Sequence, residues 1–497
     1  MLNLSKDQFH KLYSTEKVVS LHSKIVLDVA TPVSVLHRFL DEDYFIVLES
    51  ISEHSKYDRY SYFAFDPHVV INCYPDKITL DYANGEKEER TENLYDFLDI
   101  ILKEYHQKSE DALNFQCGLM GTISYECVQF LEDVDFPEKR NLNTPLATFI
   151  MPRSVLIFDN LFNTLTIVRN VIADQLEKKD PDSVYEEALK NLADIELRIV
   201  SPLPDVILPF ELIERDEPIP YTCNMDDETF IKNVKKCKDY IAKGDIFQIQ
   251  ISRRCSIELK DGDNNVMLYR YLRYQNPSPF LFYLKLKDEA LIGASPEILV
   301  NVDGRTMTIR PIAGTRKRFS KSRTEKEIED ELINDEKEKA EHIMLVDLAR
   351  HEIAHACKSG TVTVNELMII ERYSHVIHLV SDVTGELKDK NTAIDALKYG
   401  FPAGTVTGAP KIRAMEIITE LEDVQREFYS GGIVFLDFKG NMKSALTIRS
   451  MYVKDNHAYT QAAAGIVTDS IPEMELKESE NKLRSCLSAM HKFRKDS

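Results

Sequence analysis

Residues 298–316, ILVNVDGRTMTIRPIAGTR, contain the pattern that decides the fold. Polar and apolar residues alternate on both sides of Asp303-Gly304, a dipeptide typical of two-residue hairpin turns. The stretch therefore predicts antiparallel strands joined by a tight turn. Near its end lies Ala313, between an apolar strand and Gly314, at a position where a side chain usually packs or reacts.

The C-terminal half repeats this pattern between long helical segments. Further strands are expected at 245–259, 280–286 and 290–295, and a meander follows as GGIVFLDF, KSALTIRSMYV and AYTQAAAGIV. One long helix is predicted from about Thr324 to Cys357, and another opens at Pro410. Hairpins with intervening helices indicate an α+β fold, in which helices cover antiparallel sheets.

A change of composition divides the chain. Residues 180–200 have helical apolar spacing, and five prolines then fall between 201 and 222, which cannot form a regular helix. We therefore predict a domain at 1–200, a Pro-rich linker at 201–222 and a second domain at 223–497.

Composition limits the possible functions. A chain of 497 residues with 43% hydrophobic and 29% charged residues is typical of a soluble protein with more than one domain. No apolar run reaches the roughly 18 residues of a membrane span, and the N-terminus does not resemble a signal peptide, so we expect a cytoplasmic protein. A net charge of −20 argues against binding to nucleic acid or an anionic membrane.

The eight cysteines include no CxxC pair and no regular spacing. Neither a disulfide framework nor a zinc site is indicated, and we expect reduced, mostly buried thiols.

Two predicted helices carry carboxylates one turn apart, Glu338 with Glu341 and Glu475 with Glu478. Such spacing is often just a solvated acidic face, because surface charges contribute little. Glu341, however, precedes the apolar run IMLVDLA, and a half-buried carboxylate needs a cation, for which Mg²⁺ is the natural oxygen-bound candidate.

Other candidate residues lie in apolar surroundings. His378 falls within a strand-like run, where a histidine can simply be a hydrogen-bonded core residue. Arg449 stands among apolar strand residues, so we expect it to face a carboxylate of the protein or of a ligand. The loops 401–411 and 461–467 are rich in small residues and favour the approach of an anion to the backbone.

Eight motifs of the C-terminal half resemble those of the chorismate-utilising enzymes. They occur in that family's order over about residues 224–490: GDIFQ, NPSPF, GASPE, PIAGTR, AEHIMLVDLAR, ERYSHVIHLVS, FPAGTVTGAPKIRAMEII and QAAAGIV. VLES (47–50), RYS (59–61) and CGLMGTISYE (117–126) resemble the other domain of the anthranilate synthase component I branch. The resemblance implies an α/β/β/α sandwich of antiparallel sheets flanked by helices.

The resemblance also implies roles for individual residues. Glu297 of the SPE motif corresponds to the general acid that helps the ring hydroxyl of chorismate to leave, assisted by His378. Glu341 and Glu478 correspond to the Mg²⁺ ligands, with Glu338 and Glu475 behind them. The residues implied to bind the substrate carboxylates are Thr405, which also belongs to the catalytic set, Tyr429, Arg449, Ala463, Ala464, Gly465 and Lys482.

Two positions distinguish the nucleophiles used in this family. Relatives that add water carry a lysine base where this chain has Gln248, and a neutral amide cannot activate water in that way. Relatives that make aminodeoxychorismate attack the ring with a lysine at the position of Ala313, which has no nucleophile. The resemblance therefore implies direct addition of ammonia, elimination of pyruvate and formation of anthranilate, the first step of tryptophan biosynthesis.

The family also implies partners. The chain shows no glutaminase-like cysteine, so ammonia from glutamine would come from a separate amidotransferase subunit, anthranilate synthase component II, in a heterotetramer. A tryptophan feedback site is implied at Glu49, Ser50 and Lys56, with Pro279, Phe280 and Leu281 opposite.

This sequence departs from the family at several positions. Ala463 and Phe280 replace a frequent glycine and a frequent tyrosine, and LARHE at 348–352 replaces LARND. Two alternatives remain, an aminodeoxychorismate synthase component I, against which Ala313 argues, and a non-catalytic regulatory homologue, which would predict a broken set of acid and metal residues.

Overall fold

The computed structural model describes residues 2–50, 59–107, 113–173, 179–203, 220–260, 265–318, 322–373 and 376–495. Its helices are α1 (Lys6–Tyr13), α2 (Pro32–Leu36), α3 (Leu94–Glu104), α4 (Pro181–Ile199), α6 (Asp227–Lys243), α7 (Asn265–Gln275), α8 (Glu325–Asn334), α9 (Glu336–Ala356), α10 (Ala393–Gly400), α11 (Lys411–Leu421) and α12 (Pro472–Lys495), with 3₁₀ turns η1 (Tyr125–Phe130) and η2 (Gly404–Val406).

The strands form two antiparallel series that share β3 and β7. The first runs β1 (Val18–Val26), β8 (Thr164–Ile172), β7 (Ala147–Asp159), β3 (Tyr60–Cys73), β2 (Tyr44–Glu49), β11 (Phe280–Leu286), β12 (Glu289–Ser295), β21 (Ser450–Lys454), β22 (His457–Ile466) and β10 (Gln248–Glu258), with the short β9 (Thr222–Cys223) and β18 (Gly408–Ala409) on β10.

The second series starts at β5 (Lys87–Arg90) and β4 (Ile78–Tyr82), passes through β3 and β7, and continues as β6 (Gly118–Ile123), β19 (Gly432–Asp437), β20 (Met442–Leu446), β13 (Asn301–Asp303), β14 (Thr306–Ile309) and β17 (Val376–Glu386). Both β15 (Ile312–Lys317) and β16 (Thr363–Arg372) pair with β17. The hairpin at Asp303-Gly304 forms as predicted, joining β13 to β14.

The alternation of side chains along the strands builds separate core layers. On β19, Val434 and Leu436 belong to one apolar cluster, which includes residues of α3, α9 and α10, whereas Ile433 and Phe435 belong to a second cluster between the sheets. On β3, Phe63 packs in a third cluster with residues of α4, α7 and α12. Since successive strand residues face opposite sides, each sheet has helices on one face and the other sheet on its other face.

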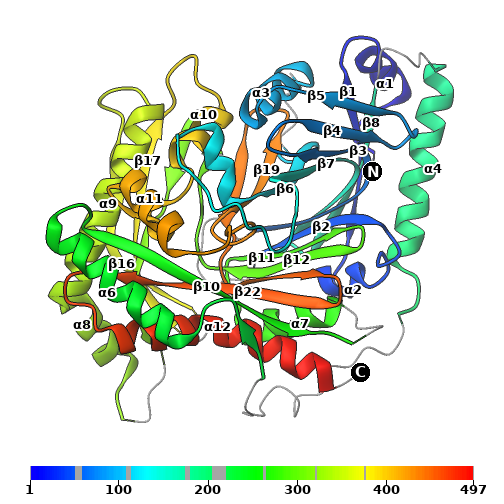
Figure 1. Cartoon of the computed structure of the whole chain (residues 1–497). Helices are drawn as coiled ribbons and strands as arrows, with labels where there is room; N and C mark the ends of the chain where they lie inside the picture. Colours follow the sequence, from blue (N-terminus) through cyan, green and yellow to red (C-terminus); the bar gives the residue numbers. More distant parts are fainter. Residues whose placement is uncertain are drawn as a thin grey trace.

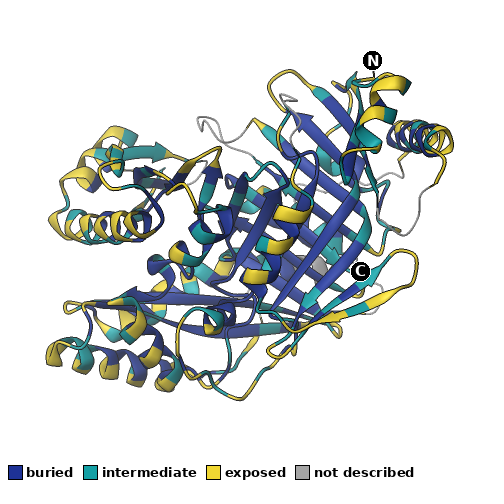
Figure 2. Cartoon of the chain, turned by 90° about the horizontal axis from the view of Figure 1, so that it is seen from above, coloured by how far each residue is buried: buried dark blue, intermediate teal, exposed yellow. Residues whose placement is uncertain are grey.

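This arrangement confirms the predicted α+β fold and its α/β/β/α layering. The helix α12 lies along β22 and contacts α7, and α10 contacts α9 on the other side of the molecule (Figure 1). Figure 2 shows the strands largely buried and the outward helix faces exposed. Within the described residues, no helix is long and apolar enough to cross a membrane.

The predicted domain boundary is crossed by strand pairing. From the two sides of the predicted linker, β2 pairs with β11 and β6 pairs with β19. Most of the linker, residues 204–219, lies outside the described residues. The division at 201–222 therefore stays a prediction, while the sheets themselves are built from both halves of the chain.

Two predicted elements are interrupted. The helix expected from Thr324 to Cys357 is two helices, because Asp335 has an extended backbone and its side chain accepts hydrogen bonds from the N–H groups of Lys337 and Glu338, which starts α9. The expected strand KSALTIRSMYV breaks where Arg449 takes a left-handed backbone, with φ of 51°.

The expectation that all cysteines are reduced is wrong for one pair. Cys223 and Cys255 form a disulfide, because β9 pairs with β10 in a register that places them opposite each other. The two cysteines are 32 residues apart in the sequence, and no motif indicated that they would pair. The other six cysteines are free and buried, as expected.

Candidate active site

The chemistry predicted for Glu297 is supported by its surroundings. Glu297 follows β12, is only 8% exposed, and accepts a 2.6 Å hydrogen bond from the Thr405 hydroxyl on η2. Burial raises the pKa of Glu297 to about 7, although the Thr405 hydrogen bond and the Lys482 charge lower it. A carboxyl with this pKa is partly protonated at neutral pH, so it can donate a proton.

His378 lies on β17 beside a bulge in β15. Its Nδ1 is 3.0 Å from the Thr315 hydroxyl and 3.3 Å from the Gly314 carbonyl, and Gly314 has φ of 62°. Burial lowers the pKa of His378 to about 4, so the ring is neutral at pH 7. A carbonyl can only accept, so we assign the ring proton to Nδ1, which leaves Nε2 as an acceptor.

Ala313 immediately precedes this bulge. It pairs with Leu379, the register shifts, and Thr315 then pairs with His378. Ala313 is half-buried. The position predicted to distinguish nucleophiles therefore belongs to the strand whose next two residues contact the His378 ring.

The predicted metal ligands meet between α9 and α12. Burial raises the pKa of Glu341, and the negative charges of Glu338 and Glu478 raise it further, so these carboxylates are close enough to repel one another. The side-chain amide of Gln248, at the start of β10, donates to Oε1 of Glu341 at 3.1 Å. Burial raises the pKa of Glu475 as well, and Glu478 adds to the effect.

The pairing of these carboxylates fits a divalent cation. Glu478 pairs with Lys482 at 2.7 Å and Glu338 pairs with Arg316 at 2.8 Å. Among the described residues, neither Glu341 nor Glu475 has a lysine or arginine ion pair, and Oε2 of Glu475 is buried without a hydrogen-bond partner. Glu475 is buried and Glu341 is half-buried, and carboxylates in such positions without a basic partner are suited to Mg²⁺.

The protein does not complete a metal site by itself. In the described part of the chain, no three His, Cys, Asp or Glu side chains converge into a metal-binding group. Mg²⁺ commonly takes one or two protein carboxylates and fills its other positions with water or substrate oxygens. The carboxylates present are therefore sufficient for a shared site.

The residues predicted to bind substrate carboxylates gather around β22. The Lys482 ammonium donates to the Ala463 carbonyl at 2.9 Å, and the Arg449 guanidinium donates to the Lys482 carbonyl at 3.4 Å. Burial raises the pKa of Tyr429, while a hydrogen bond involving the Ala463 backbone lowers it. Among the described residues, Arg449 donates to a backbone carbonyl and forms no ion pair with a protein carboxylate, which was one of the two expected partners.

Gly465 brings this strand close to β10. A Cβ atom at Gly465 would lie 2.9 Å from Nε2 of Gln250 and 3.4 Å from Nε2 of Gln248. The absence of a side chain therefore leaves room for the Gln250 amide, while the Gln248 amide would lie at ordinary contact distance. Ala464, the preceding residue, is fully buried and points into the apolar cluster under α6 and α11.

Sequence reasoning missed three residues that shape this site. Thr315 and Gly314 orient the His378 ring, and Arg316 neutralises Glu338. The only indication of them in the sequence was the motif AGTR, in which Gly314 precedes Thr315 and Arg316. The contacts of these residues depend on the bulge.

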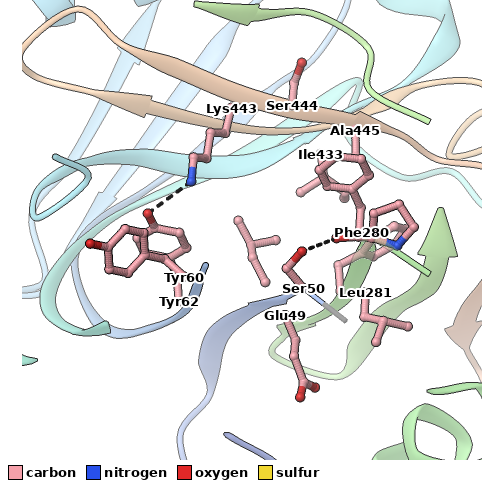
Figure 3. A pocket seen from close by; sticks show the side chains of 13 residues that line it. Glu49, Ser50, Tyr60, Tyr62, Phe280, Leu281, Ile433, Lys443, Ser444 and Ala445 are labelled. Atoms are coloured by element: carbon pink, nitrogen blue, oxygen red, sulfur yellow. Dashed lines mark hydrogen bonds between the residues drawn. The ribbon is translucent and has the colours of Figure 1, made fainter. Parts of the chain in front are cut away.

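The predicted inhibitor residues other than Lys56 line a pocket between β2, β11 and β20 (Figure 3). Ser50 donates to the Pro279 carbonyl at 2.7 Å, and Phe280 and Leu281 form the neighbouring wall. The remaining lining residues are Leu48, Glu49, Tyr60, Tyr62, Phe282, Ile433, Lys443, Ser444 and Ala445. Lys56, also predicted here, lies outside the described residues.

Glu49 lines this pocket with its stem but not with its charge. Its carboxylate receives two hydrogen bonds from the Arg273 guanidinium, at 2.6 and 2.9 Å, and one from the Tyr269 hydroxyl at 2.8 Å. Figure 3 shows the carboxylate directed away from Ser50. Ser50 and Lys443 bring polar groups to the lining of the pocket, together with Tyr60 and Tyr62.

Comparison with known proteins places the chain in a family. Residues 46–488 match the family described as chorismate binding enzyme. The chain belongs to this family, and its fold and site define a chorismate binding enzyme.

Two relatives named anthranilate synthase component 1 match the chain over almost its whole length. It is 37% identical to anthranilate synthase component 1 of Acetivibrio thermocellus over 479 residues, which are 95% of both proteins, and 37% identical to that of Aquifex aeolicus over 493 residues, 98% of both.

Two solved structures are similar to the fold of this chain. Anthranilate synthase component I from Streptococcus pneumoniae superposes with a TM-score of 0.75 at 32% identity, covering 93% of this chain and 99% of that one. The menaquinone-specific isochorismate synthase from Escherichia coli has a TM-score of 0.70 at 17% identity, covering 98% of both, and so shares the fold alone.

Proposed function

We propose that this chain is the large component of an anthranilate synthase, converting chorismate and ammonia into anthranilate and pyruvate. The observation that carries the proposal is the buried Glu297 carboxyl, which lies 2.6 Å from the Thr405 hydroxyl and, with a pKa raised to about 7, can protonate a leaving hydroxyl. Full-length similarity to proteins named anthranilate synthase component 1 supports the same assignment.

The surroundings of Glu297 suggest how the chain handles chorismate. Lys482 and Arg449 supply positive charge along β22, where the backbone of 463–465 can approach a substrate carboxylate. The neutral His378 ring, with Nε2 unprotonated, can accept a hydrogen bond near the leaving hydroxyl. We propose that Glu341 and Glu478 hold Mg²⁺, for which Glu478 would give up its ion pair with Lys482, and the ion would neutralise a second substrate carboxylate when bound.

The proposal that ammonia is the nucleophile rests on two positions, one without a base and one without an amine. Gln248 is a neutral amide that donates a hydrogen bond to Glu341, so it cannot deprotonate water. Ala313 offers no amine for attack on the ring. Ammonia is itself a nucleophile and needs neither group. This argues against an isochorismate synthase and against aminodeoxychorismate synthase component I, and the intact set of Glu297, His378 and glutamates argues against a non-catalytic homologue.

We also propose two partners for the chain. Glutamine would be hydrolysed by an amidotransferase subunit, since relatives are named as component 1 of a synthase. Tryptophan would bind in the pocket beside Ser50 described above, called here the Ser50 pocket. Its apolar and aromatic walls suit an indole ring, and Ser50 and Lys443 suit the polar groups of the amino acid.

The test is direct. The purified chain is incubated with chorismate, Mg²⁺ and concentrated ammonium salt, anthranilate is followed by its fluorescence, and all products are identified by mass. Anthranilate and pyruvate in equal amounts are expected. Accumulation of isochorismate, salicylate or aminodeoxychorismate would show that the chemistry is assigned wrongly.

A further inference from the structure

Two histidines near the end of α9 lie outside the site described above. His351 and His355 are both exposed and one helical turn apart. Their Nε2 atoms are 3.1 Å apart, so that one ring N–H donates to the other nitrogen, and their ring centroids are 4.6 Å apart; a metal ion that replaced this proton would lie between the two nitrogens. The neighbouring α10 supports them, because Tyr399 stacks on the His355 ring at 5.6 Å with an interplanar angle of 15°.

This geometry is that of a chelating pair. Histidines at i and i+4 on one helix face can bind the same metal ion, and neutral imidazole is a good ligand for Zn²⁺, Ni²⁺ and Cu²⁺. The site lies in the last turns of α9, where the helix dipole favours a cation. Asp347, one turn before His351, adds a negative charge, and its exposed ion pair with Arg350 is of a kind that contributes little.

We propose that His351 and His355 form a surface site for a divalent transition-metal ion, with solvent in the remaining coordination positions. In the described residues no third His, Cys, Asp or Glu completes a metal-binding group, so the site would be open. Mg²⁺ prefers oxygen ligands and is not expected there.

The sequence HEIAH at 351–355 has the HExxH spacing of zinc proteases, but its glutamate is not available. Glu352 is only 6% exposed and its carboxylate lies 2.5 Å from the Lys411 ammonium, inside the protein. A protease would need this carboxylate free beside the metal as a general base. The pair of histidines therefore binds a metal without supplying hydrolytic chemistry.

The experiment uses the full chain without a polyhistidine tag. Binding of Ni²⁺ is measured by calorimetry in the presence of excess Mg²⁺, which occupies carboxylate sites, and Cu²⁺ is examined by electron paramagnetic resonance for nitrogen ligands. We expect one site of moderate affinity, with Cu²⁺ bound more tightly than Ni²⁺. His351→Ala and His355→Ala should each weaken binding by more than about tenfold, since even indirect partners of a metal matter that much.

His457→Ala is the matched control, because His457 is also a histidine near the surface but has no second histidine beside it in the described structure. Its ring nitrogen contacts the Asp455 carbonyl instead. The proposal fails if no Ni²⁺ binds, if both α9 variants bind as well as the original chain, or if the control loses binding equally. The melting temperature without metal is measured for every variant, so that a loss of fold is recognised.

Discussion

The hydroxyl of Thr405 lies 2.6 Å from the carboxyl of Glu297 and donates a hydrogen bond to it. Burial raises the pKa of Glu297 to about 7, and the Thr405 bond limits that rise because it stabilises the charged form. A general acid works in its protonated form. We therefore expect kcat to fall as the pH rises through about 7, and Glu297→Gln to lower kcat by about 10²- to 10⁴-fold.

Thr405→Val tests the same pair in a different way. Loss of a hydrogen bond to a charged group, worth about 1.5–3 kcal/mol, should raise the pKa of Glu297, so the alkaline fall in kcat should move upward by about one pH unit or more. The pH profile of kcat at saturating chorismate measures this. Thr405→Ser keeps the hydroxyl and serves as control. An unshifted profile in the valine variant would remove Glu297 from the titrating step.

The metal assignment predicts dependence on Glu341. Glu341→Gln removes a charge at a half-buried carboxylate that has no basic ion-pair partner among the described residues, and activity with Mg²⁺ should fall at least about 10- to 100-fold. EDTA should abolish activity, and added Mg²⁺ should restore it. Glu336→Gln is the control, because Glu336 lies on the same helix but its side chain is 88% exposed and pairs with Lys339. Equal losses in both variants would mean that the assignment is wrong.

The identity of residue 313 should matter for the reaction. Ala313→Lys places an amine beside the bulge that orients His378, and we expect less anthranilate. Ala313→Met has a similar length without the amine, so it separates bulk from chemistry. Anthranilate formation and the mass of the protein after incubation with chorismate are measured. Full activity in the lysine variant would place residue 313 outside the pocket.

Much of the fold could be predicted from the sequence because its strands follow simple periodicity. The strand expected at 280–286 occurs as β11, and the Asp303-Gly304 hairpin forms as expected. What could not be predicted is which strands become neighbours. The pairing of β2 with β11, and of Cys223 with Cys255, joins residues far apart in sequence, and no local pattern specifies such contacts.

Candidate residues for the site could be proposed from the sequence, but their geometry could not. The family motifs identify Glu297 and Glu341, and the structure brings Glu341 together with Gln248 and Glu478. The orientation of His378 depends on a bulge at Gly314, and the carboxylate of Glu49 is held by Arg273. Such details follow from register and from partners on other strands, which a single stretch of sequence does not contain.

The Ser50 pocket is connected through β20 to the backbone of Glu297, the candidate acid. Ser444 and Ala445 line the pocket, and the next residue, Leu446, donates its N–H to the Glu297 carbonyl at 3.1 Å. A ligand that presses on β20 would therefore reach the backbone of the candidate acid. We expect tryptophan to inhibit competitively with chorismate.

Ser50→Arg should remove that inhibition, because a long charged side chain would fill the pocket and the bond from Ser50 to the Pro279 carbonyl would be lost. Activity without tryptophan should stay near that of the original chain, since the pocket contains none of the candidate catalytic residues. Ser14→Arg, at an exposed position after α1, is the control and should leave inhibition intact. Inhibition curves with tryptophan at several chorismate concentrations give the measurement. If Ser50→Arg is inhibited as strongly as the original chain, tryptophan binds elsewhere and β20 does not transmit its effect.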